Sequence, residues 1–187
     1  MILFILGLII FFGTHLFTAA ARGQREALVN RLGAGPYKGL YSLVSIAGFA
    51  LIVIGWPKAD ATVVYVSPYW LVHVVYLLML IALTLLAAAY LPKGRIAHAA
   101  KHPMLAAVKI WAFAHLLVNG EVRSLLLFGA FLAYAVFDRI AVKRRGEPVP
   151  ASGPVMNDAI AVGVGAAAWA AIFFWLHPYI AGAPIPR

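Results

Sequence analysis

Residues 102–120 read HPMLAAVKIWAFAHLLVNG. The stretch is apolar enough to lie inside a membrane, yet it contains two histidines, a lysine and an asparagine. Ionisable groups in the hydrocarbon core cost about 2.5–3.5 kcal/mol each on insertion scales, so they usually have a function. Pro103 suits the first turn of a helix, and Gly120 suits its end. The stretch therefore predicts one short transmembrane helix that holds most of the functional polar side chains.

The polar groups of this helix fall on two faces. Trp111, His115 and Asn119 share one stripe of the helical wheel, whereas His102 and Lys109 lie on a nearly opposite face. The two histidines are thirteen residues apart in the sequence, which is about 20 Å along a helix axis. They cannot bind one metal ion together, so a site at His115 takes its other groups from other helices.

The composition identifies an integral membrane protein. Of 187 residues, 64% are hydrophobic and 11% are charged, and the mean hydropathy is +0.93. The net charge of +9 does not indicate nucleic-acid binding, because the basic residues sit in alternate loops between apolar runs. The chain has no cysteine, which excludes disulfides, thiolate metal sites, iron–sulfur clusters and a cysteine nucleophile.

The apolar runs predict an all-α fold, a polytopic transmembrane helix bundle that forms one domain over residues 1–187. The six predicted spans are residues 1–21, 39–56, 68–91, 102–120, 124–142 and 158–176. Residues 33–36, Gly-Ala-Gly-Pro, are expected to break any helix between the first two spans. Gly163 and Ala167 give the last span a face of small residues suited to close helix packing.

The charges of the loops predict the orientation. The loops after the first, third and fifth spans are basic, and those after the second and fourth are near neutral. The positive-inside rule then places the three basic loops in the cytoplasm and both termini outside, in the periplasm.

The histidines in the spans suggest either packing residues or haem ligands. Helix bundles build haem sites from histidines on facing helices, and haem iron accepts imidazole nitrogen. His15 is one partner for His115, and His73 is the rival, because His73 and His115 are both predicted near the outer side. Arg22 and Arg25 either contact lipid phosphates as topogenic charges or bind haem propionates.

The remaining polar residues of the central helix keep two interpretations each. His102 is an interfacial residue or part of a site. Lys109 reaches the headgroups by snorkelling, or pairs with an anion such as a cofactor carboxylate or a lipid phosphate. Trp111 packs in the core or forms a wall of a cofactor pocket. Asn119 caps the helix or hydrogen-bonds locally, or it belongs to the cofactor site.

The acidic residues argue against transport, because all of them lie at span ends or in loops: Glu26, Asp60, Glu121, Asp138, Glu147 and Asp158. A proton-coupled transporter usually carries a carboxylate inside the membrane, and neither internal repeats nor broken helices are visible in the sequence. Paired catalytic carboxylates, a phosphate-binding glycine loop and a Ser-His-Asp set are not legible either.

Several motifs together resemble the NnrU family of bacterial membrane proteins over essentially the whole chain. They are residues 102–105 (HPML) with Lys109 and Trp111, residues 114–120 (AHLLVNG), His15, residues 38–43 (KGLYSL) and residues 125–131 (LLLFGAF). The resemblance implies a multi-pass protein of the bacterial inner membrane that is associated with denitrification, specifically with nitrite and nitric oxide reduction. The family is related to the plant 15-cis-zeta-carotene isomerase, a membrane haem b enzyme.

The resemblance to that relative implies which residues hold a haem. Its haem histidines lie seven residues before an arginine in an early span and in the helix after a His-Pro motif. Here His15 precedes Arg22 by seven, and His115 follows His102-Pro103. The isomerase also has a cysteine three residues before its second haem histidine, where this chain has Ala112, so a cysteine-dependent ligand switch does not carry over.

The leading hypothesis is an inner-membrane protein that binds one haem b through His15 and His115. Its partners would be membrane lipids and a lipophilic small molecule. Its role would be redox sensing, electron transfer or a redox-gated isomerisation. The alternative is a non-haem accessory protein that helps components of a nitrogen-oxide reductase to assemble or be expressed. A third hypothesis, a methyltransferase-like enzyme acting on lipids or isoprenoids, lacks a legible nucleotide-binding site.

Overall fold

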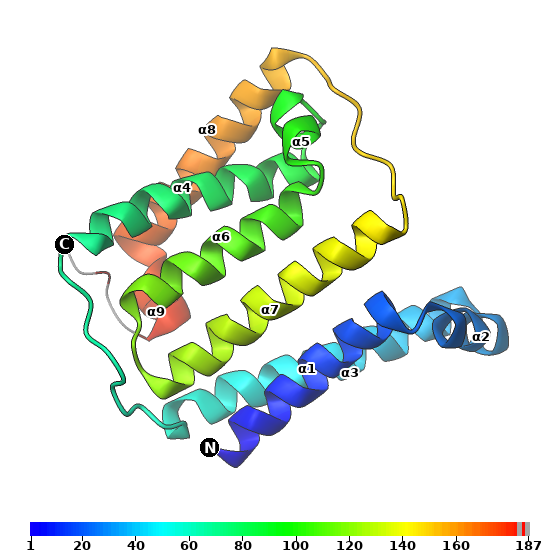
Figure 1. Cartoon of the computed structure of the whole chain (residues 1–187), viewed down its shortest axis with the longest axis horizontal. Coiled ribbons are helices and arrows are strands. Elements are labelled where there is room, and N and C mark those ends of the chain that lie inside the picture. The colour runs from blue at the N-terminus through cyan, green and yellow to red at the C-terminus, as the bar shows by residue number, and fades with distance from the viewer. Residues whose placement is uncertain (183–184, 186–187) are drawn as a thin grey trace. The chain divides into compact units, whose positions relative to one another are not determined.

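The computed structural model describes residues 1–182 and 185, and the described chain is helical (Figure 1). It divides into two compact units. Unit 1 is Met1–Tyr65 with Glu121–Gly146, and unit 2 is Val66–Gly120 with Glu147–Arg187. The single domain expected over residues 1–187 remains a prediction. The predicted position of the C-terminus outside the membrane falls on residues that lie outside the described part of the chain.

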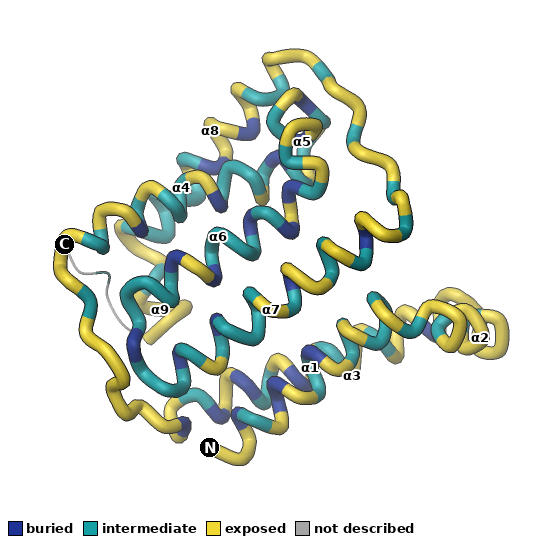
Figure 2. The backbone as a smooth tube through the Cα atoms, in the orientation of Figure 1, coloured by how far each residue is buried: buried dark blue, intermediate teal, exposed yellow. Residues whose placement is uncertain are grey.

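Among residues 1–182 and 185, five helices are long and apolar enough to cross a membrane. They are α1 (Ile2–Ala20), α3 (Ala34–Gly55) with its continuation to Lys58, α4 (Leu71–Tyr90), α7 (Val122–Arg144), and α8 (Val155–Ala171) with its continuation to Ala181. Only 11% to 28% of each apolar window is buried inside the protein, and Figure 2 shows exposed residues along all five. Such apolar surface is stable in contact with lipid and not with water, so the chain is a multi-pass membrane protein.

The central stretch forms α6 (Pro103–Val118), which begins at the predicted proline and ends just before Asn119 and Gly120. With 16 residues it is about 24 Å long, whereas the hydrocarbon core is about 30 Å thick. The described residues therefore contain five long candidate spans and one shorter apolar helix, rather than six equivalent spans.

The basic segment after α1 is itself a helix, α2 (Arg22–Leu32), and this was not predicted. The expected break at residues 33–36 is right only at Gly33, whose φ of 86° an L side chain rarely adopts. Ala34, Gly35 and Pro36 instead form the first turn of α3. Pro36 is tolerated there because N–H groups in a first turn have no partner within the helix.

In unit 1, α1 and α3 run antiparallel and side by side (Figure 1), and glycines bring their backbones together. A Cβ built on Gly48 would lie 2.7 Å from the backbone N of Phe11, and one on Gly7 would lie 2.6 Å from the backbone N of Ile52. The core beside this contact consists of Phe4, Leu8, Phe12, Ile52 and Ala59, and Leu127, Ala130, Phe131 and Tyr134 of α7 pack against it.

We expect Gly48→Ala to destabilise the protein by about 1–3 kcal/mol, because the new methyl group forces the two backbones apart. The matched control is Gly13→Ala in α1, where a Cβ meets nothing within 4 Å. Alanine is the better helix former by up to about 1 kcal/mol, so the control should be neutral or stabilising. Thermal unfolding of the detergent-solubilised variants, followed by circular dichroism, measures both. Equal melting temperatures would contradict the close approach of α1 and α3.

The loop that follows α3 is tied to the start of α7. The backbone N–H of Val122 donates to the Thr62 carbonyl at 3.0 Å, and that of Arg123 donates to the Asp60 carbonyl at 2.9 Å. The guanidinium of Arg123 also lies over the Trp56 ring, 4.8 Å from its centroid. Hydrogen bonds from the Thr62 side chain and backbone hold the pKa of Asp60 below its ordinary value.

In unit 2, α4 packs against both α6 and α8. The close contact of α8 is made by Gly165, where a Cβ would lie 2.6 Å from the Cα of Thr84, with Ala161 also buried. The predicted packing face of Gly163 and Ala167 is wrong, because both residues are exposed. The helix α8 continues through a π-helical turn, Ile172–Leu176, into α9 (His177–Ala181).

A carboxylate of α8 holds the short helix α5 (Arg95–Ala100) in place. Asp158 accepts hydrogen bonds from the backbone N–H groups of Arg95 at 3.0 Å and Ile96 at 2.9 Å. Both N–H groups lie in the first turn of α5, where backbone N–H groups have no carbonyl acceptor within their own helix. Asp158, from the first turn of α8, therefore caps the start of α5.

Candidate functional site

His15 lies in an aromatic setting built by three helices of unit 1. Its ring centroid is 4.2 Å from that of Phe11 on α1, 5.6 Å from that of Tyr41 on α3 and 5.7 Å from that of Tyr134 on α7. Its Nδ1 is 2.7 Å from the backbone carbonyl oxygen of Phe11, one helical turn earlier. These contacts fix the orientation of the imidazole within a half-buried, mostly apolar environment.

A short polar chain leads from this setting to the end of α7. The Tyr134 hydroxyl donates to the Asp138 carboxylate at 3.5 Å, and Arg145 forms an ion pair with Asp138 at 3.8 Å. Arg145 also donates to the backbone carbonyl of Ala19 at 3.2 Å, which ties the end of α7 to the end of α1. Tyr134 and Asp138 lie on α7 and Arg145 is its C-cap residue, and only the Ala19 carbonyl is brought to them by the packing of α1 against α7.

His115 occupies the last turn of α6 in unit 2. Its Nδ1 is 2.8 Å from the carbonyl oxygen of Trp111, and the two ring centroids are 5.2 Å apart. The Asn119 side chain donates to the His115 backbone carbonyl at 2.9 Å, which agrees with the predicted local role of Asn119. His115 also interacts electrostatically with His177 at the start of α9.

The two histidines share one arrangement of ring nitrogens. A carbonyl oxygen can only accept a hydrogen bond, so Nδ1 must be the protonated, donating nitrogen in each ring. In the neutral imidazole the lone pair then lies on Nε2. This is the state in which a histidine binds a metal, with the ring held by a hydrogen bond from its other nitrogen. The donor chemistry of both rings therefore fits an axial haem ligand.

The rival ligand, His73, lies near the start of α4 in unit 2 and is exposed. Its ring centroid is 6.0 Å from that of Tyr69 and 5.8 Å from that of Tyr76. The start of α4 and the end of α6 belong to the same end of this unit, because the Ser67 hydroxyl donates to the Leu117 carbonyl. The choice between His73 and His15 as the second ligand stays a prediction.

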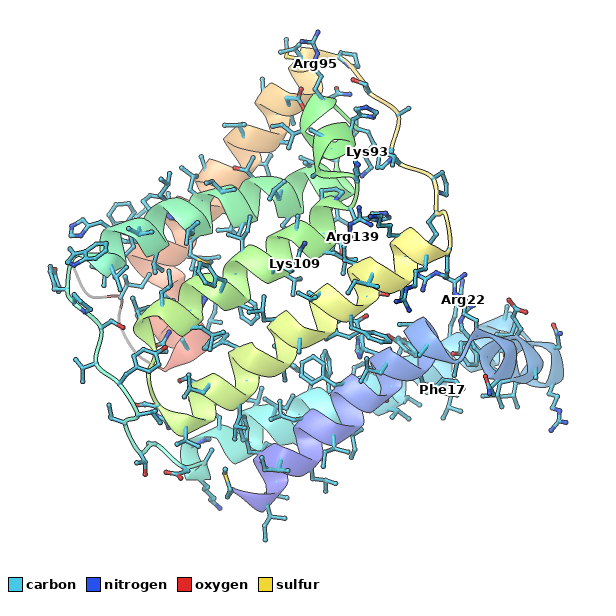
Figure 3. The ribbon with its side chains drawn as sticks, viewed as in Figure 1. Phe17, Arg22, Lys93, Arg95, Lys109 and Arg139 are labelled. Atoms are coloured by element: carbon cyan, nitrogen blue, oxygen red, sulfur yellow. The ribbon has the colours of Figure 1, made fainter. Side chains whose placement is uncertain are left out.

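The other predicted residues occupy scattered positions. His102 is the N-cap residue of α6, and Lys109 is half-buried midway along the same helix (Figure 3). In unit 1, Arg22 begins α2, and the Arg25 guanidinium lies 5.7 Å from the centroid of the Tyr37 ring. The structure therefore groups Trp111 and Asn119 with His115, and it does not group His102 or Lys109 with that stripe.

No three His, Cys, Asp or Glu side chains among residues 1–182 and 185 gather so as to hold a metal ion. A porphyrin supplies the equatorial nitrogens itself, so a haem needs only axial ligands from the protein. Sequence reasoning did not single out Tyr41, Tyr134, Asp138 or His177 as neighbours of the two histidines. The spacing of Tyr134 and Asp138, one helical turn apart, was the only available signal.

A family model described as NnrU protein matches residues 3–185 of the chain. Neither a curated protein nor a solved structure matches it.

Proposed function

The chain belongs to the NnrU protein family, and from this membership we propose that it is a haem-binding membrane protein linked to denitrification. In this proposal His15 and His115 would hold one haem b. The observation that carries the proposal is the shared state of the two rings, each with Nδ1 bonded to a carbonyl one turn earlier and the lone pair on Nε2.

The residues around the two histidines have distinct roles in this proposal. Phe11 and Trp111 pack against the ligating rings and supply the carbonyls that orient them. Arg22 would pair with a haem propionate through its guanidinium N–H groups. A bound haem supplies a one-electron iron couple. Because Ala112 provides no thiol for a ligand switch, we assign redox sensing or electron transfer rather than isomerisation.

An absorption spectrum of the detergent-solubilised wild-type protein tests the proposal. A Soret band, with a haem-to-chain ratio near one, is the expected result. A protein that stays colourless after growth and refolding with added haem contradicts the proposal. That result would favour the accessory role, in which the chain helps a nitrogen-oxide reductase to assemble without holding a cofactor.

We also propose that α6 makes a sixth crossing of the bacterial inner membrane, with both termini in the periplasm. The support is the charge pattern: Arg22, Arg25 and Arg31 follow α1, and Lys143 and Arg144 end α7, whereas the segment after α3 holds Lys58 with Asp60. A helix of 16 residues crosses when the bilayer thins locally around it.

Single cysteines test the orientation, because the chain has none of its own. We expect a thiol reagent that does not cross membranes to label Lys58→Cys in intact spheroplasts and to label Lys143→Cys only after lysis. If Lys143→Cys is labelled in spheroplasts and Lys58→Cys is not, the topology is the opposite of the proposed one.

A further inference from the structure

Three helices of unit 1 line an open groove of about 300 Å³. Its walls include Phe17 of α1, Leu28 and Leu32 of α2, and Tyr41 and Val44 of α3. It belongs to the part of the chain where α1 ends and the basic helix α2 begins, and Figure 3 shows Phe17 and Arg22 on either side of that junction. Apolar α1 is a candidate membrane span and polar α2 is not, so the groove lies where acyl chains meet headgroups.

The walls of the groove offer contacts for hydrocarbon. The two leucines of α2 are exposed, Leu28 to 38% and Leu32 to 45%, so their side chains are accessible to a ligand in the groove. The one aliphatic hydroxyl in the wall, that of Thr14, donates to the Ile10 carbonyl of its own helix at 2.7 Å. A polar ligand body would find few partners here, whereas an acyl chain would bury apolar area on both sides.

The rim of the groove is cationic. The Arg25 guanidinium lies over the ring of Tyr37, 5.7 Å from its centroid, and Tyr37 is itself a groove residue. Helix α2 carries Arg22, Arg25 and Arg31 against the single acid Glu26. A guanidinium binds phosphate through paired N–H donors, and each cation near an anionic headgroup layer adds to the attraction.

We propose that this groove is a binding site for one anionic phospholipid. Its acyl chain lies between Phe17, Leu28 and Val44, and its phosphate is bound by Arg25 at the rim. Charge complementarity selects the occupant, because a zwitterionic lipid offers the same phosphate but brings a cationic headgroup beside the Arg25 guanidinium, whereas an anionic phospholipid brings a net negative charge. The acyl chain of the lipid would also lie against Tyr41, whose ring contacts that of His15. An occupied groove therefore borders the histidine of the candidate site.

Native mass spectrometry of the full-length protein in neutral detergent tests the site, with phosphatidylglycerol and phosphatidylcholine of matched chains as probes. We expect the wild type to bind one phosphatidylglycerol about fivefold more tightly than phosphatidylcholine, the ratio that one well-placed arginine supplies. Arg25→Gln should bring this ratio close to one. Leu28→Gln, a change on the surface of α2, should weaken the binding of both lipids and leave the ratio of their affinities unchanged.

The control is Arg31→Gln, which removes the same charge from the last turn of the same helix and should keep the preference. Equal losses in Arg25→Gln and Arg31→Gln would overturn the proposal in favour of diffuse attraction to a basic surface. Equal binding of both lipids by the wild type would overturn it as well, as would full competition by chain-free glycerophosphoglycerol. None of these measurements depends on haem, so they test the lipid site independently of the proposed haem.

Discussion

Replacing either His15 or His115 with alanine should reduce the haem content of the purified protein at least about tenfold. Each substitution removes an axial imidazole, and even the loss of a residue that only orients a metal ligand typically costs about 10–100-fold in affinity. The readout is the Soret absorbance per chain, measured after purification with and without added haem. His15→Gly and His115→Gly should regain part of the band in millimolar imidazole, which can enter the space left by the side chain.

The matched control is His98→Ala. His98 is an exposed histidine whose Nδ1 is 2.9 Å from the Pro150 carbonyl oxygen, so its removal tests loss of a histidine outside the candidate site. It should leave the Soret band unchanged. A full haem content in His15→Ala, with loss in His73→Ala or His177→Ala, would contradict the assignment and place both ligands in unit 2.

Most of the helices could be predicted from the sequence because membrane spans carry their own signal. A run of about 20 apolar residues is legible without any knowledge of its neighbours, and α1, α4 and α7 appear within a few residues of their predicted bounds. The ends of α6 were predicted because Pro103 and Gly120 favour helix boundaries locally. Helix α2 was missed because its polar, arginine-rich sequence resembles a loop when only hydropathy is considered.

Contacts between helices could not be predicted in the same way. Lipid-facing and core-facing residues of a span are both apolar, so hydropathy did not show that Gly165 rather than Gly163 packs against Thr84. For the same reason, the residues around His15 could not be predicted. Intramembrane histidines were visible as costly residues, but their neighbours Tyr41 and Tyr134 come from helices that are distant in the sequence.

Asp138→Ala should destabilise unit 1 by about 1–3 kcal/mol, the range for a lost hydrogen bond to a charged group. The carboxylate accepts from the Tyr134 hydroxyl at 3.5 Å and pairs with Arg145 at 3.8 Å. The two side chains of the ion pair are only 17% and 20% exposed, so solvent screens it less than a surface pair. Thermal unfolding in detergent measures the loss.

Two further variants separate the ion pair from a general effect of charge at the end of α7. Arg144→Gln removes an exposed cation beside Arg145 and should change the stability by less than about 0.5 kcal/mol. In the double variant Asp138→Ala/Arg145→Gln, the second change should cost less than it does alone, because its partner is already gone. Strictly additive losses would show that Asp138 and Arg145 act independently. In that case the bond from Arg145 to the Ala19 carbonyl, rather than the ion pair, would hold the end of α7 against α1.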